Sequence, residues 1–162
     1  MEEYLIRYFT AEKQESLIFM IVGISALLIS LYLLKSDSSY KGMIYPLIFV
    51  AIIQLVVGGT VFFRTNGQVA TLKIQLNDSP VHYKTDEVAR MNTVMKNFKI
   101  YKSIEIILLL AGIILTFIVR DRNFWYSVGV GLIIQSSFML VLDLFAEKRG
   151  LEYLNKLTDF VF

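Results

Sequence analysis

The segment that most constrains the fold of this chain runs from residue 85 to residue 120, because its two halves suit different solvents. The first half, TDEVARMNTVMKNFKIYK, is charged and amphipathic, whereas the second, SIEIILLLAGIILTFIV, is apolar on every side. No Gly or Pro separates the halves, so the sequence predicts one uninterrupted helix. At ~1.5 Å per residue it would be roughly 50 Å long, well beyond the ~30 Å hydrocarbon thickness of a bilayer, so part of it must stand in water.

Three further segments combine an apolar run with an amphipathic extension in the same way. The predicted spans cover residues 17–34, 43–63, 103–119 and 124–145, and the predicted extensions cover residues 3–16, 64–77, 85–102 and 146–157. A hydrophobic fraction of 56% with 19% charged residues fits a membrane protein with sizeable polar ends. The expected fold class is all-α: one domain of 162 residues that forms an antiparallel up-down-up-down four-helix bundle crossing the membrane four times.

The connection between the second and third predicted helices is the least regular part of the pattern. The second helix is predicted to continue past Asn66-Gly67 to about Asn77, although this dipeptide also fits a break. Residues 77–84, NDSPVHYK, are predicted to form a loop, and Thr85 or Asp86 would then cap the third helix. Tighter reversals are expected at KSDSSYKG, residues 35–42, and at residues 120–122.

The basic residues are distributed unevenly over the two ends of this bundle. The end with the two outer reversals carries Lys35, Lys41, Arg120 and Arg122, and the other end carries the remaining 12 of the 16 Lys and Arg residues. Cytoplasmic segments of membrane proteins carry an excess of Lys and Arg, so both termini are expected in the cytoplasm, with the protein in the inner cell membrane. Membrane lipids are therefore expected partners.

Two amide side chains are expected at the same depth in the bundle. Counting down from the outer reversals at ~1.5 Å per residue places Gln54 and Gln135 near the middle of the membrane. A hydrogen bond between them would contribute about 0.6 to 2 kcal/mol. The pair would serve either as a structural contact or as a polar level in a permeation path.

A second polar level is expected where the spans meet the extensions. Its members are Glu12, Glu15, Arg64, Gln68, Lys102, Glu105, Asp143 and Glu147. Carboxylates on three helices would face Arg64, whose planar guanidinium suits them, in a buried ion-pair network. Glu105 is the most informative member, because it lies inside an apolar run where a charge facing lipid would be costly. Binding of a ligand, a proton or an ion is the alternative role of this level.

Several classes of function have no support in the sequence. The chain has no Cys, and its one histidine, His82, falls in the predicted loop, so no metal site and no cofactor are expected. No G-x-S-x-G motif is present. The net charge of +2 is small and the basic residues alternate with acids, so nucleic acid is not an expected partner.

The expected function is that of a non-enzymatic membrane protein that acts through protein contacts, as a regulatory, immunity-type or accessory subunit. One alternative is an oligomeric channel or transporter for ions or small solutes, and another is a membrane enzyme or lipid-binding protein with a carboxylate-lined site. The extensions are expected to close a small cytoplasmic core; if the first helix or residues 160–162 were free, they would instead bind a partner protein or a second copy of the chain. The expected core residues are Leu5, Phe9, Leu72, Leu76, Val88, Met91, Met95, Phe98, Tyr153 and Leu157.

Overall fold

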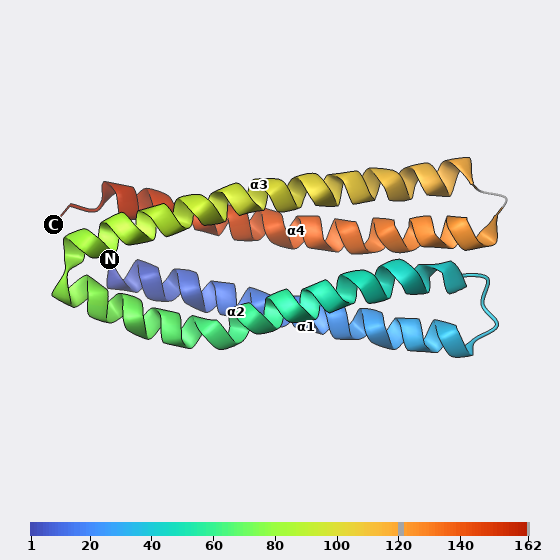
Figure 1. Ribbon diagram of the computed structural model, residues 1–162, viewed down its shortest axis with the longest axis horizontal. Helices are drawn as coiled ribbons and strands as arrows, with labels where there is room; N and C mark the ends of the chain where they lie inside the picture. The colour runs from blue at the N-terminus through green and yellow to red at the C-terminus, as the bar shows by residue number, and fades with distance from the viewer. Residues whose placement is uncertain (120–121, 162) are drawn as a thin grey trace.

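The computed structural model describes residues 1–119 and 122–161, which form four long α-helices without any β-strand (Figure 1). The helices are α1 (Glu2–Lys35), α2 (Ile44–Asp78), α3 (Pro80–Ile118) and α4 (Asn123–Asp159), and the short 3-10 helix η1 (Lys41–Met43) precedes α2. The all-α fold class is therefore confirmed.

The four helices form two antiparallel hairpins, α1–α2 and α3–α4, which lie side by side along their length (Figure 1). Contacts within each hairpin are more extensive than contacts between the hairpins. The N-terminus, the C-terminal end of α4 and the α2–α3 connection share one end of the molecule, which we call the termini end. The reversal between α1 and α2 lies at the opposite end.

The predicted loop over residues 77–84 is wrong, because Ser79 is the only residue between α2 and α3. The backbone N–H of Ser79 donates a hydrogen bond to the carbonyl of Gln75 at the end of α2. The Ser79 carbonyl accepts a hydrogen bond from the N–H of Tyr83 in α3. Pro80 starts α3 at a position where a helix needs no N–H donor. Thr85 and Asp86 therefore lie inside α3 and do not cap it.

The other helix boundaries follow the sequence pattern closely. The helix predicted to continue through Asn66-Gly67 does so, and Gly67 is exposed with no atom within 4 Å of the position its Cβ would take. Arg122 is the residue before α4, and the rest of the reversal predicted at residues 120–122 lies outside the described residues.

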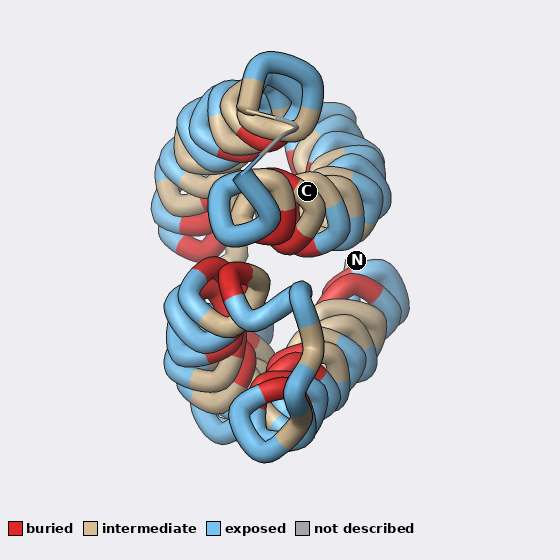
Figure 2. The backbone as a smooth tube through the Cα atoms, turned by 90° about the vertical axis from the view of Figure 1, so that its right-hand side faces the viewer, coloured by how far each residue is buried: buried red, intermediate tan, exposed pale blue. Residues whose placement is uncertain are grey.

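All four helices are long and apolar enough to cross a membrane. Only 11 to 33% of the residues in their most apolar windows are buried within the protein. Figure 2 shows that the buried residues lie on the surfaces that the helices turn toward one another. The opposite surfaces expose large apolar side chains such as Leu28, Phe49, Ile107 and Phe117 within the apolar part of each helix. Contiguous exposed apolar surfaces mark sites of interaction, and on helices of membrane-spanning length this surface indicates contact with lipid.

Glycine allows the two helices of each hairpin to approach closely. A Cβ on Gly112 of α3 would lie 2.9 Å from the carbonyl oxygen of Gly129 on α4, and a Cβ on Gly58 of α2 would lie 2.9 Å from the carbonyl oxygen of Ser16 on α1. Small residues at helix contacts are typical of membrane-spanning helices, which gain little from burying apolar side chains against each other.

A hydrophobic core closes the termini end. Buried residues from all four helices form it, namely Leu5, Tyr8, Phe9, Leu72, Tyr83, Met91, Tyr153 and Leu157. Six of these residues were predicted, and the predicted Leu76 and Val88 pack against them. Met95 and Phe98 are half-buried and, like Met91, lie where a side chain at Gly150 would project.

Candidate functional site: a buried polar column

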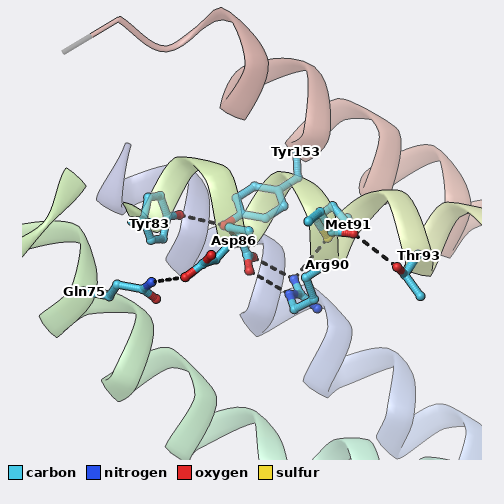
Figure 3. Close-up of polar contacts among 9 residues, drawn as sticks. Gln75, Tyr83, Asp86, Arg90, Met91, Thr93 and Tyr153 are labelled. Carbon is cyan, nitrogen blue, oxygen red and sulfur yellow. Dashed lines mark hydrogen bonds and ion pairs between the residues drawn. The ribbon is translucent and has the colours of Figure 1, made fainter. Parts of the chain in front are cut away.

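The most completely bonded polar cluster lies at the termini end, around Glu87 of α3. The Glu87 side chain is 1% exposed, and its two carboxylate oxygens accept hydrogen bonds of 2.7 Å from Nε and Nη2 of Arg90. The Tyr153 hydroxyl of α4 donates to the same carboxylate over 3.1 Å. Because the single Tyr153 proton is used there, the Tyr83 hydroxyl donates to Tyr153 over 2.9 Å (Figure 3).

This cluster also joins the two hairpins. The ring of Tyr8 on α1 stacks on Tyr153, with centroids 4.5 Å apart and planes at 8°. The Arg90 guanidinium lies 5.2 Å from the centroid of the Phe9 ring, a cation–π contact between α3 and α1. We call Tyr8, Tyr83, Glu87, Arg90 and Tyr153 the tyrosine cluster.

Burial moves the pKa of the phenols in the tyrosine cluster still further above physiological pH. It raises the pKa of Tyr83 to about 12, and it raises the pKa of Tyr8 and of Tyr153 well above the ordinary value of a phenol. All three hydroxyls therefore remain protonated at physiological pH and are available as hydrogen-bond donors.

Sequence reasoning missed the tyrosine cluster. The sequence pattern predicts a loop at Tyr83 and only a core position at Tyr153. A helix that starts at Pro80 places Tyr83, Glu87 and Met91 on one face at steps of four residues, so the signal was present once the helix start was known.

Two ion pairs lie closer to the predicted spans. Arg149 of α4 pairs with Glu15 of α1, and Lys102 of α3 pairs with Glu147 of α4. Burial raises the pKa of Glu15 to about 7 against the opposing effect of Arg149. Both pairs are partly exposed, and each connects two helices.

Arg64 differs from its expected role as the central cation. Its side chain is exposed, and within the described ranges it makes no ion pair; Arg149 faces Glu15 instead. Glu12 and Gln68 lie at this level with one side-chain oxygen each buried and without a hydrogen-bond partner among the described residues. Burial raises the pKa of Glu12, and the charges of Arg90 and Arg64 oppose the increase.

Glu105 lies deeper along α3, inside the predicted span. Its side chain is 1% exposed, and neither carboxylate oxygen has a hydrogen-bond partner in the part of the chain that the structure describes. Lys102, one turn earlier, is bonded to Glu147. Asp143 of α4 is half-buried and is the carboxyl that interacts electrostatically with Glu105. The structure thus brings these two acids together, and the charge of Lys102 acts on both of them.

The deepest polar level contains Gln54 of α2 and Gln135 of α4. The Gln54 amide donates from Nε2 to Oε1 of Gln135 over 3.3 Å, and both side chains are buried. Two other buried polar atoms at this level lack a hydrogen-bond partner among the residues described. They are Oε1 of Gln54 and the hydroxyl of Ser136, which follows Gln135 in the chain.

Together these groups form a polar column inside the protein, from the tyrosine cluster to the Gln54–Gln135 pair. Buried polar atoms normally have a hydrogen-bond partner, either in the protein or in ordered water. The atoms without one lie at several depths, on Glu12, Gln68, Glu105, Gln54 and Ser136. The column is therefore bonded at the termini end and incompletely bonded toward the middle.

The described residues contain no group of three or more His, Cys, Asp or Glu side chains that could hold a metal ion. His82 is exposed and lies in the first turn of α3, not in the predicted loop.

A separate feature is an open groove between α1 and α2 at the termini end, with a volume of about 540 Å³. It is lined by Ile6, Phe9, Thr10, Lys13, Thr65, Asn66, Val69, Ala70 and Lys73. Lys13 donates to the Asn66 side chain over 2.9 Å, and Lys73 pairs with Glu2 at 3.0 Å. We call this the α1–α2 groove.

Comparison with family models, with curated proteins and with solved structures found no match to this chain.

Proposed function

We propose that this chain is a non-enzymatic multi-pass protein of the inner cell membrane, a four-helix bundle with both termini in the cytoplasm, that acts through protein contacts. The exposed apolar middle of the helices supports the membrane location, and the excess of Lys and Arg at the termini end supports the orientation. A regulatory, immunity-type or accessory subunit fits this description.

The observation that carries the proposal is the α1–α2 groove. Its residues on α1 precede the predicted span that begins at residue 17, so the groove faces the cytoplasm and not lipid. Ile6, Val69 and Ala70 provide an apolar surface, and positive charge comes from Lys13 and from Lys73, which is paired with Glu2. An amphipathic partner segment with acidic residues complements such a groove in both shape and charge.

Site-specific photo-crosslinking tests this proposal in the intact membrane. A photo-reactive amino acid at Ala70 should give one discrete adduct with a partner, whereas the same residue at Ala89, which is exposed on α3 outside the groove, should not. The pair of changes Lys13→Glu and Lys73→Glu should abolish the adduct, and Lys96→Glu with Lys148→Glu should leave it intact. Equal adducts at positions 70 and 89, or none at either, would contradict the proposal.

The polar column favours a second candidate, a channel or transporter for ions or small solutes. Polar side chains inside membrane-spanning helices that lack a hydrogen-bond partner are typical of sites that contact water or a transported ion. Four spans leave little room for a pore within one chain, so subunits would share the pathway.

The absence of Cys from the sequence makes this second candidate directly testable. Ser136→Cys places a thiol on the column, and Ile134→Cys places one on an exposed apolar surface at nearly the same depth. If the column is hydrated, a small charged thiol reagent added from the cytoplasmic side should label the first and not the second. An unreactive thiol at position 136, together with ion flux in liposomes that is unchanged by Glu105→Gln, would exclude this candidate.

A further inference from the structure

A second groove lies between α3 and α4, on the hairpin that does not contribute to the α1–α2 groove. It is open, with a volume of about 450 Å³, and it is lined by Lys99, Lys102, Ser103, Ile106, Leu140 and Leu144. Four of these residues lie on α3 and two on α4. We call this the α3–α4 groove.

The α3–α4 groove changes in character along its length. Lys99 and Lys102 precede the predicted span that begins at residue 103, whereas Ile106 and Leu140 lie within predicted spans. One end of the groove is therefore basic and at the level of the lipid headgroups, and the other end is apolar and at the level of the acyl chains. Ile106 and Leu144 are among the exposed large apolar side chains, so this part of the groove is open to the bilayer.

The two lysines have different surroundings. Lys102 is held over the groove by its ion pair with Glu147, which occupies one of the three donors of its ammonium group. Lys99 is exposed and makes no ion pair with any residue in the ranges 1–119 and 122–161. Lys99, Lys102 and Glu147 together carry a net charge of +1 at the headgroup end of the groove, and the carboxyls of Glu105 and Asp143 act on Lys102 from deeper in the hairpin.

We propose that the α3–α4 groove binds one anionic phospholipid. The lipid phosphate lies between Lys99 and Lys102, within reach of the Ser103 hydroxyl, and an acyl chain lies along Ile106, Leu140 and Leu144. Basic pockets between membrane helices on the cytoplasmic side are suited to acidic headgroups, and each Lys near such a surface contributes about fivefold in affinity. The proposal depends on the orientation given above but not on the α1–α2 groove.

Native mass spectrometry of the purified full chain in a neutral detergent tests this site. Phosphatidylglycerol should remain bound to the protein more than phosphatidylcholine does, since only the first has a net negative charge. The change Lys99→Gln with Lys102→Gln should reduce the preference for phosphatidylglycerol by about tenfold or more. The matched pair Lys96→Gln with Lys148→Gln removes the same charge from exposed positions outside the groove and should leave the preference unchanged.

Two further experiments identify the bound species. Leu140→Trp fills the apolar part of the groove and should weaken lipid binding, whereas Val141→Trp on an exposed surface outside the groove should not. Excess inorganic phosphate should not displace phosphatidylglycerol, because it lacks the acyl chain; displacement would show an anion site and overturn the proposal.

Equal binding of the two lipids by the unmodified protein, or equal effects of the two double glutamine variants, would also overturn it. Lys99→Arg keeps the charge and should keep the preference. That variant shows whether a loss in the glutamine variants comes from charge or from a folding defect.

Discussion

Tyr8 of α1 stacks on Tyr153 of α4 with their ring centroids 4.5 Å apart, and this contact connects the two hairpins within the core of the termini end. Tyr153 has a second role, because its hydroxyl links Tyr83 to the Glu87 carboxylate. One side chain therefore combines an apolar contact between hairpins with a hydrogen-bonded chain inside the α3–α4 hairpin.

The contribution of the Tyr153 hydroxyl to stability can be tested with the change Tyr153→Phe, which keeps the ring and removes the oxygen. The buried Tyr83 hydroxyl would lose its partner, so the free energy of unfolding should fall by about 1 to 3 kcal/mol. Chemical denaturation in detergent, followed by circular dichroism, measures this change. Tyr101→Phe removes a hydroxyl from an exposed tyrosine and should have little effect. Equal stability of both variants would show that the hydroxyl chain contributes nothing.

The Glu87–Arg90 pair should behave as a buried charge pair. Arg90→Leu leaves the Glu87 carboxylate buried without its two strongest donors, so we expect a loss of about 3 to 5 kcal/mol. The double change of Glu87 and Arg90 to Leu should recover much of this loss, because no unpaired charge remains. A double variant as unstable as Arg90→Leu alone would contradict this interpretation.

Glu15 should make stability depend on pH. Burial raises its pKa to about 7 in the folded protein, whereas an unfolded glutamate titrates near its ordinary value of 4.5. The folded state therefore binds the proton more tightly, and the stabilisation is fully present below about pH 4.5 and is lost as the pH rises through about 7. Glu15→Gln should flatten the melting-temperature profile in this window, and Glu152→Gln, at an exposed position, should not. A Glu15→Gln profile as steep as that of the unmodified protein would show that other groups cause the slope.

Glu105 and Glu147 should respond differently to replacement by Leu. No donor among the described residues bonds to either oxygen of Glu105, which faces the Asp143 carboxyl, so Glu105→Leu should be neutral or stabilising. Glu147→Leu would leave the part-buried Lys102 without its carboxylate and should destabilise the protein. Melting temperatures in detergent compare the two, and a larger loss for Glu105→Leu would indicate a partner for Glu105 in the functional state.

Two glycines in the helices should also respond in opposite directions. Gly112→Ala places a methyl group 2.9 Å from the Gly129 carbonyl oxygen and should separate α3 from α4 at a cost in stability. Gly67→Ala meets no atom within 4 Å and should stabilise α2 by roughly 0.8 to 1 kcal/mol, because Ala has the higher helix propensity. Thermal unfolding of both variants in the same detergent distinguishes the effects; a loss in Gly67→Ala would indicate a contact at that surface with another molecule.

The sequence predicted the features that depend on position along one helix. The four apolar runs, the continuation of α2 through Asn66-Gly67 and the common depth of Gln54 and Gln135 all follow from counting residues along rods of known rise. Depth requires no knowledge of how each helix is rotated about its axis.

The features that were missed depend on rotation and on helix starts. Arg64 and Arg149 lie on different helices at the same level, and only packing decides that Arg149 faces Glu15 while Arg64 faces outward. Pro80 was interpreted as part of a loop, although proline is equally suited to the first position of a helix, and that interpretation removed Tyr83 from consideration.

The single residue between α2 and α3 has a mechanical consequence. Ser79 alone separates α2 from α3, so the chain leaves no slack between the hairpins at the termini end. At the other end η1 packs against α4, and a side chain at Gly42 would clash with the backbone of Phe124, so the hairpins are in close contact there as well. Any rotation of one hairpin against the other therefore has to rearrange contacts at both ends of the bundle.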